Sequence, residues 1–127
     1  MKAPTNTGLA RLVAAYRNSK AGLRDMWTRE EAFRQEVIIL VLAVPLAIWL
    51  ASSVAQFGLM VGSLLMLIIV EILNSAIEAT VDRIGEERHE LSRIAKDLGS
   101  AAVLLTALFP AAIWIAIVLD RLGVLTL

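Results

Sequence analysis

The chain has 127 residues, 58% of them hydrophobic, and its 12 basic and 12 acidic residues cancel to a formal net charge of zero. This length predicts a single domain, and the neutral balance gives no electrostatic argument for nucleic-acid binding. Cysteine is absent, which excludes disulfides, thiolate metal sites and a cysteine nucleophile. A typical soluble domain is about half apolar, so the excess of hydrophobic residues indicates contact with lipid.

Residues 1–35 are expected to form an amphipathic arm on the membrane surface. Leu9, Leu12, Val13 and Tyr16 recur at helical spacing, and basic side chains are interspersed with apolar ones along the segment. This pattern is typical of a helix that lies in the membrane interface, with its cations near the lipid phosphates. A flexible basic tail is the alternative interpretation.

Three apolar stretches follow, at 36–51, 54–81 and 97–119, and a membrane-spanning helix needs about 20 such residues. The alternative is three buried helices of a soluble protein, but a chain this short cannot cover helices that are apolar on all sides. Pro45 and Pro110 fall inside the first and third stretches, where membrane helices tolerate proline. We therefore predict an all-α membrane protein, with residues 1–127 as a single membrane domain of three spans.

Basic residues are distributed unevenly between the two ends of these spans. The arm carries seven, the 52–56 connector carries none, and the loop predicted at 82–96 carries Arg83, Arg88, Arg93 and Lys96. Short loops rich in lysine and arginine stay on the cytoplasmic side of a membrane. The arm and the 82–96 loop are therefore expected to face the cytoplasm.

Polar residues follow one face at the end of the second span. At about 100° per residue, Glu71, Asn74, Glu78 and Asp82 project at about 0°, 300°, 340° and 20° around the helix. If the membrane boundary lies near Asp82, Glu71 is about 16 Å inside it at 1.5 Å per residue. A carboxylate there costs on the order of 3 kcal/mol, so it needs a partner or a polar cavity.

These residues allow more than one function. Burial suits Glu71 to accept a proton, and a metal ion or cation beside Glu78 would suit that carboxylate to ligation. Asn74 and Ser75 could instead only join helices by hydrogen bonds. No G-x-x-x-x-G-K-[ST] or G-x-G-x-x-G motif is present, so no motif implies a nucleotide. The residues alone leave open an enzyme acting on a lipid at the cytoplasmic face and a proton or ion carrier.

The residues of the charged loop and of the start of the third span can also be explained without a functional role. His89 is the only histidine, and a single histidine in a charged loop is more often solvated than catalytic. Lys96 and Asp97 precede an apolar run, where Asp97 would favour a helix N-terminus through the helix dipole. The loop charges from Arg83 to Arg93 are by default a solvated face.

Several motifs, in order along nearly the whole chain, resemble the small prokaryotic diacylglycerol kinase family. They are Gly22-Leu-Arg, Trp27, Glu31-Ala-Phe-Arg-Gln-Glu36, Glu71-Ile-Leu-Asn-Ser-Ala-Ile-Glu-Ala, Val81-Asp-Arg-Ile-Gly, His89-Glu-Leu-Ser and Ala95-Lys-Asp-Leu-Gly-Ser-Ala-Ala-Val. The motifs of the arm are similar to the Gram-negative branch, which favours diacylglycerol as substrate. A related branch phosphorylates undecaprenol and shares the motif of the second span, so it is the alternative.

The resemblance implies a homotrimer of three-span subunits with an N-terminal surface helix, in the bacterial inner membrane. Such an enzyme transfers phosphate from MgATP to diacylglycerol and gives phosphatidic acid, with active sites between neighbouring subunits. It would serve lipid metabolism.

The resemblance also implies a role for individual residues. Glu71 would be the base and Asn74 would orient the reacting group, while Glu30 and Glu78 would hold Mg²⁺. The nucleotide would be bound by Arg11, Asn18, Glu30, Glu78, Glu87, Arg88, His89, Lys96 and Asp97. The lipid would contact Arg11, Arg24, Asp25, Met26, Trp27, Ala32, Phe33, Arg34, Gln35, Glu36, Trp49, Glu71 and Ser100.

Overall fold

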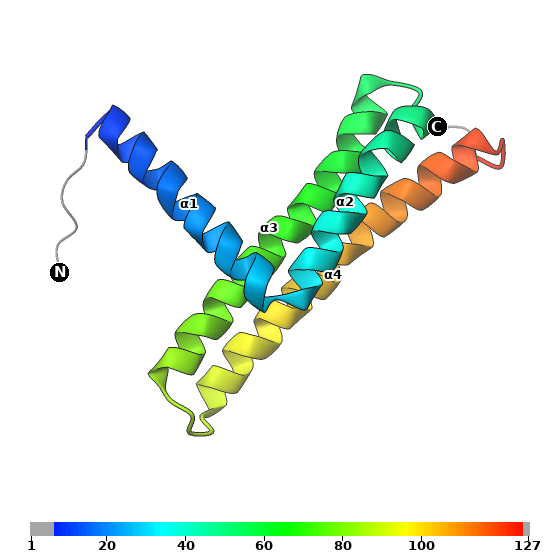
Figure 1. The fold of residues 1–127 in the computed structure, drawn as a ribbon. Coiled ribbons are helices and arrows are strands. Elements are labelled where there is room, and N and C mark those ends of the chain that lie inside the picture. Colours follow the sequence, from blue (N-terminus) through cyan, green and yellow to red (C-terminus); the bar gives the residue numbers. More distant parts are fainter. Residues whose placement is uncertain (1–6, 126–127) are drawn as a thin grey trace. The chain divides into compact units, whose positions relative to one another are not determined.

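The computed structural model describes residues 7–125, which form helices joined by short connections and contain no strand (Figure 1). The helices are α1 (Leu9–Arg29), α2 (Glu31–Leu50), α3 (Val54–Ile84) and α4 (Glu90–Arg121). The first six residues of the predicted arm lie outside the described part. The chain divides into two compact units, with the boundary between Arg34 and Gln35.

The first unit contains α1, an exposed helix with no buried residue. Its apolar side chains Leu9, Leu12 and Tyr16 are 77%, 68% and 71% exposed, so they pack on nothing within this unit. The helix ends at Arg29 because Glu30 adopts an extended conformation, and the Glu30 N–H donates to the carbonyl of Met26 at 2.9 Å. An exposed apolar stripe on a basic helix is the pattern of a helix that binds a membrane surface.

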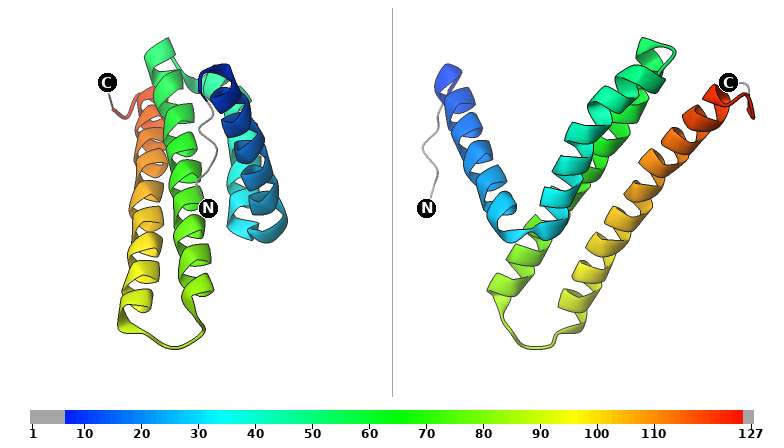
Figure 2. Two further views of the ribbon diagram at one scale, coloured as in Figure 1. Left: turned by 90° about the vertical axis from the view of Figure 1, so that its left-hand side faces the viewer. Right: turned by 45° about the vertical axis from the view of Figure 1, so that its right-hand side comes forward.

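The second unit is built on two long antiparallel helices, α3 and α4, which both views of Figure 2 show side by side and joined by residues 85–89. With α2, they are long and apolar enough to cross a membrane. Even α2, with 20 residues, spans about 30 Å, the thickness of a bilayer's hydrocarbon core. The predicted all-α fold with three such helices is confirmed.

A serine and a glutamine cap the start of α3. The Ser53 side chain accepts from the N–H of Gln56 at 3.2 Å, and the Gln56 side chain accepts from the N–H of Ser52 at 2.8 Å. This reciprocal pattern satisfies N–H groups that a helix N-terminus leaves without partners. It favours the start of α3 at Val54, with only three residues between Val54 and the last residue of α2, Leu50.

The three helices of this unit meet in a small apolar cluster. Ala47 and Leu50 of α2 contact Met60 of α3 and Ile117 of α4, and Ala47 and Met60 are 0% exposed. The indole N–H of Trp114 donates to the carbonyl of Met60 at 3.2 Å, which ties α4 to α3 at this level. The cluster fixes the register of the helices, and so the level at which their polar residues meet.

Candidate functional site

The inner face of α3 carries the buried polar residues. Its buried positions recur every three or four residues, with Ser63 and Leu64 adjacent, and form one stripe of helical period. They are Met60, Ser63, Leu64, Ile68, Glu71 and Ser75. Glu71 is only 7% exposed, so a carboxylate lies on the internal face of an apolar helix.

Three buried side-chain oxygens of this unit have no hydrogen-bond partner among residues 7–125: Glu36 Oε2, Asn74 Oδ1 and Ser75 Oγ. Asn74 and Ser75 follow Glu71 by one helical turn, on the same side of α3. Glu36 of α2 lies close enough to Glu71 for the two charges to interact. An unsatisfied buried polar atom costs about 1–3 kcal/mol, so a cluster of them is suited to a polar ligand rather than to packing.

Beyond Asn74 the polar face continues toward the end of α3. The Asn74 amide nitrogen donates to Glu78 Oε1 at 3.3 Å, and Glu78 is half-buried. At the outer end, Lys96 Nζ of α4 lies 2.5 Å from Asp82 Oδ1. The side chains of this polar face therefore become more exposed from Glu71 to Asp82, and the face ends beside the ammonium group of Lys96.

Lys96 stands before the apolar part of α4, which begins at Leu98. The hydrogen bond to Asp82 raises the pKa of Lys96 above its ordinary value, and the nearby charge of Glu78 acts in the same direction. The ammonium group therefore stays charged at neutral pH, where it can neutralise an anion.

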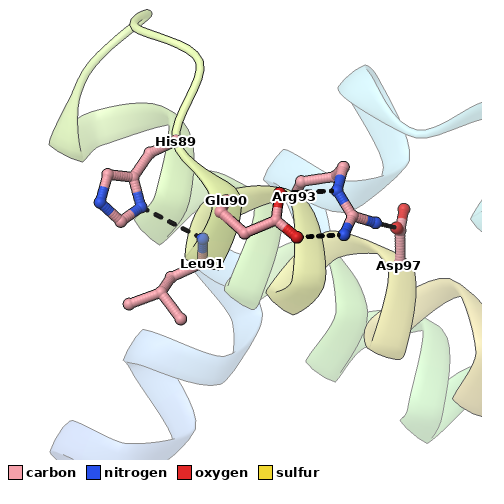
Figure 3. A network of polar contacts seen from close by, with 5 residues as sticks. All are labelled: His89, Glu90, Leu91, Arg93 and Asp97. Carbon is pink, nitrogen blue, oxygen red and sulfur yellow. Dashed lines mark hydrogen bonds and ion pairs between the residues drawn. The ribbon is translucent and has the colours of Figure 1, made fainter.

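The start of α4 holds a second set of charges (Figure 3). His89 caps the helix through Nδ1, which accepts from the N–H of Leu91 at 3.1 Å. Arg93 lies 2.6 Å from both Glu90 Oε1 and Asp97 Oδ2. These side chains are more than half exposed, so the pairs hold Asp97 in place at the surface but add little stability.

The structure groups Glu36, Glu71, Asn74, Glu78 and Lys96 along α3 and its neighbours. Other predicted site residues of the second unit are exposed: Gln35, Trp49, Glu87, Arg88, His89, Asp97 and Ser100. The remaining ones belong to the unit that ends at Arg34, and their roles stay predictions: Arg11, Asn18, Arg24, Asp25, Met26, Trp27, Glu30, Ala32, Phe33 and Arg34.

Two further polar residues of α3 interact with this cluster or lie one turn from it, and had no predicted role in the site. Ser75 is buried one turn from Glu71, and Asp82 pairs with Lys96. The available signal for Asp82 was its place on the polar face, four residues after Glu78. Its partner, Lys96, is 14 positions away on another helix, and the period of a single helix does not predict contacts between helices.

The fold and the cluster define a helical integral membrane protein with a polar site on the inner face of a long apolar helix. A family model described as "Prokaryotic diacylglycerol kinase" matches residues 17–118. The chain belongs to this prokaryotic diacylglycerol kinase family.

Curated relatives cover almost the full chain. The diacylglycerol kinase of Escherichia coli K12 is 46% identical over 121 residues, which is 95% of this chain and 99% of that protein. The diacylglycerol kinase of Pseudomonas aeruginosa is 45% identical over 113 residues, 89% of this chain and 92% of that protein. The diacylglycerol kinase of Haemophilus influenzae is 41% identical over 108 residues, 85% of this chain and 92% of that protein.

Proposed function

We propose that the protein phosphorylates diacylglycerol with ATP and gives phosphatidic acid, at the cytoplasmic face of a bacterial inner membrane. The family and the names of its relatives support this activity. The observation that carries the site is the set of buried oxygens without a hydrogen-bond partner among residues 7–125, on Asn74 and Ser75 one turn from Glu71 and on Glu36, whose charge interacts with that of Glu71. A lipid hydroxyl is a polar group that the surrounding membrane can bring to such a helix.

Glu71 is the proposed base. Its carboxylate takes the proton of the lipid hydroxyl while the hydroxyl oxygen bonds to the γ-phosphorus of ATP. The bond from that phosphorus to the bridging oxygen breaks, and the electron pair leaves with ADP. Asn74, one turn away, orients the reacting groups, because phosphoryl transfer depends mainly on alignment and charge neutralisation.

The outer part of the polar face is the proposed nucleotide side. Lys96 is charged and lies by the end of α3, where it can attract the phosphates. Glu78 and Glu30 are the proposed magnesium ligands. The other proposed nucleotide contacts are Arg11, Asn18, Glu87, Arg88, His89 and Asp97.

Two proposed carboxylate ligands would be enough for magnesium that is bound together with a nucleotide. Among residues 7–125 no three histidine, cysteine, aspartate or glutamate side chains are grouped so that they could hold a metal by themselves. Magnesium commonly takes one or two protein carboxylates and completes its shell with phosphates and water. When bound, it supplies charge neutralisation for the phosphates.

We also propose a homotrimer with active sites shared between subunits, as the family resemblance implies. Apolar side chains along α2, α3 and α4 are exposed in the single chain, such as Val41, Met66 and Leu104 at 64%, 52% and 69%. Lipid and neighbouring subunits would cover them. The lipid would contact Trp49 and Ser100 of the second unit, Glu36 beside Glu71, and the predicted residues between Arg24 and Gln35.

The proposal is tested with purified protein in lipid nanodiscs, supplied with magnesium, labelled ATP and either diacylglycerol or undecaprenol. Labelled phosphatidic acid is the expected product. Labelled undecaprenyl phosphate instead would move the protein to the other branch of the family, and no labelled lipid would refute the kinase proposal. Proton or cation flux in ATP-free proteoliposomes would favour a carrier.

A further inference from the structure

Gly99 of α4 lies directly against the side chain of Asn74 of α3. Gly99 is buried, and a Cβ atom added to it would collide with Asn74 Oδ1 and would lie 3.2 Å from Asn74 Cγ. No other of the seven glycines meets any atom within 4 Å of such a Cβ. This is therefore the one place in the chain where the absence of a side chain permits a close approach between helices.

A glycine at this position lowers the stability of α4, and packing in the apolar cluster does not account for it. Glycine inside a helix is unfavourable relative to alanine, and Gly99 lies ten residues into α4. A glycine kept within a helix generally has a packing or functional reason. Here the contact is with a residue of the polar face, not with the apolar cluster around Met60.

The contact constrains how the Asn74 amide is turned. Its oxygen is buried against Gly99 and has no hydrogen-bond partner among residues 7–125, while its nitrogen donates to Glu78 Oε1 at 3.3 Å. A methyl group at position 99 would occupy the place of the oxygen. The amide would then have to rotate or withdraw, and the hydrogen bond to Glu78 would be lost or redirected.

We propose that Gly99 is a positioning residue, which leaves α4 bare opposite Asn74 so that the Asn74 amide is held toward Glu78. The proposal rests on the proposed kinase function only for its catalytic consequence. The contact itself is a property of the fold. Its tests are therefore both structural and kinetic.

The structural test is a double-mutant cycle in thermal stability, with wild type, Gly99→Ala, Asn74→Ala and the double variant. Gly99→Ala should lower the unfolding temperature, and the same substitution should not lower it once the Asn74 side chain is gone, because contacting residues couple. If Gly99→Ala alone fails to fold, recovery of the fold in the double variant supports the contact. An equal loss in both backgrounds would overturn it. This result does not depend on any kinase activity.

The kinetic test compares folded Gly99→Ala with Gly22→Ala. The control makes the same change in α1, at a position where the added Cβ would meet no atom within 4 Å. We expect kcat to fall by about 10- to 100-fold in Gly99→Ala, as small misplacements of positioned groups do. The magnesium concentration for half-maximal turnover should rise as well, because the Asn74 bond orients Glu78. Unchanged kcat and magnesium dependence in Gly99→Ala would overturn the positioning role. An inactive wild type would instead refute the proposed function.

Discussion

Asp82 of α3 and Lys96 of α4 form an ion pair with 2.5 Å between Oδ1 and Nζ. The pair joins the charged ends of two antiparallel helices at the outer end of the polar face. Its side chains are 66% and 41% exposed, so solvent screens it and its value lies in placing the ammonium rather than in stability. The position of Lys96 beside Glu78 is what the proposed nucleotide site requires.

The first prediction concerns pH. Asp82 raises the pKa of Lys96 above its ordinary value of 10.5. The Lys96 ammonium is therefore charged below pH 10.5, and the ion pair is lost as the pH rises through the raised pKa. Asp82→Asn removes the first cause of the shift, and Lys96 should lose its charge at lower pH. The alkaline limb of kcat/KM for ATP should move to lower pH in this variant. Superimposable alkaline limbs would show that the pair does not set the charge of Lys96 during turnover.

The second prediction concerns magnesium. Glu78→Gln keeps the size of the side chain but removes a ligand charge, so the magnesium concentration for half-maximal activity should rise about 10-fold or more. Glu86→Gln makes the same exchange at an exposed position of the 85–89 connection and serves as the control. A magnesium titration of Glu78→Gln that coincides with that of Glu86→Gln would remove Glu78 from the metal site.

The third prediction concerns the hydrogen bond from Trp114 to the carbonyl of Met60. Trp114→Phe removes the donor, and interhelical hydrogen bonds in membrane proteins average about 0.6 kcal/mol. The free energy of unfolding in mixed micelles should fall by about 0.5–1.5 kcal/mol. Trp49→Phe, at a position that is 67% exposed, should not lower stability comparably. Equal effects of the two substitutions would argue against the bond.

The fourth prediction compares two methionines of α3. Met60 is 0% exposed and Met66 is 52% exposed. Lipid is as apolar as a protein core, so the cost of Met60→Ala is mainly the packing lost around the cavity, about 2 kcal/mol or more. Met66→Ala should cost much less. The same unfolding measurement decides, and a larger loss for Met66→Ala would contradict the register of the helices.

Much of the fold was accessible from the sequence. The lengths of the apolar runs and the breaks between them predicted an all-helical protein with three membrane-length helices, and the motifs predicted the family; both are confirmed. These signals are local, because a helix of membrane length must be apolar for about 20 residues whatever its neighbours. The stripe of Glu71, Asn74 and Glu78 follows from the helical period in the same way.

Contacts between helices were not accessible. Glu36 beside Glu71, Asp82 with Lys96, and Gly99 against Asn74 each depend on the register of two helices, which single-helix periodicity does not determine. That register comes from packing around Met60 and Ala47. The catalytic, metal and lipid roles stay predictions, since they depend on bound groups and on neighbouring subunits.

The most direct measurement is the turnover of Glu71→Gln in nanodiscs with saturating MgATP and diacylglycerol, beside Glu86→Gln as control. A general base typically contributes about 10²- to 10⁴-fold, so kcat should fall by that factor while nucleotide and lipid binding persist. The unfolding temperature should hold or rise, because a buried carboxylate is removed. A Glu71→Gln protein that keeps near wild-type kcat, or that loses binding without loss of kcat, would contradict the assignment of Glu71 as the base.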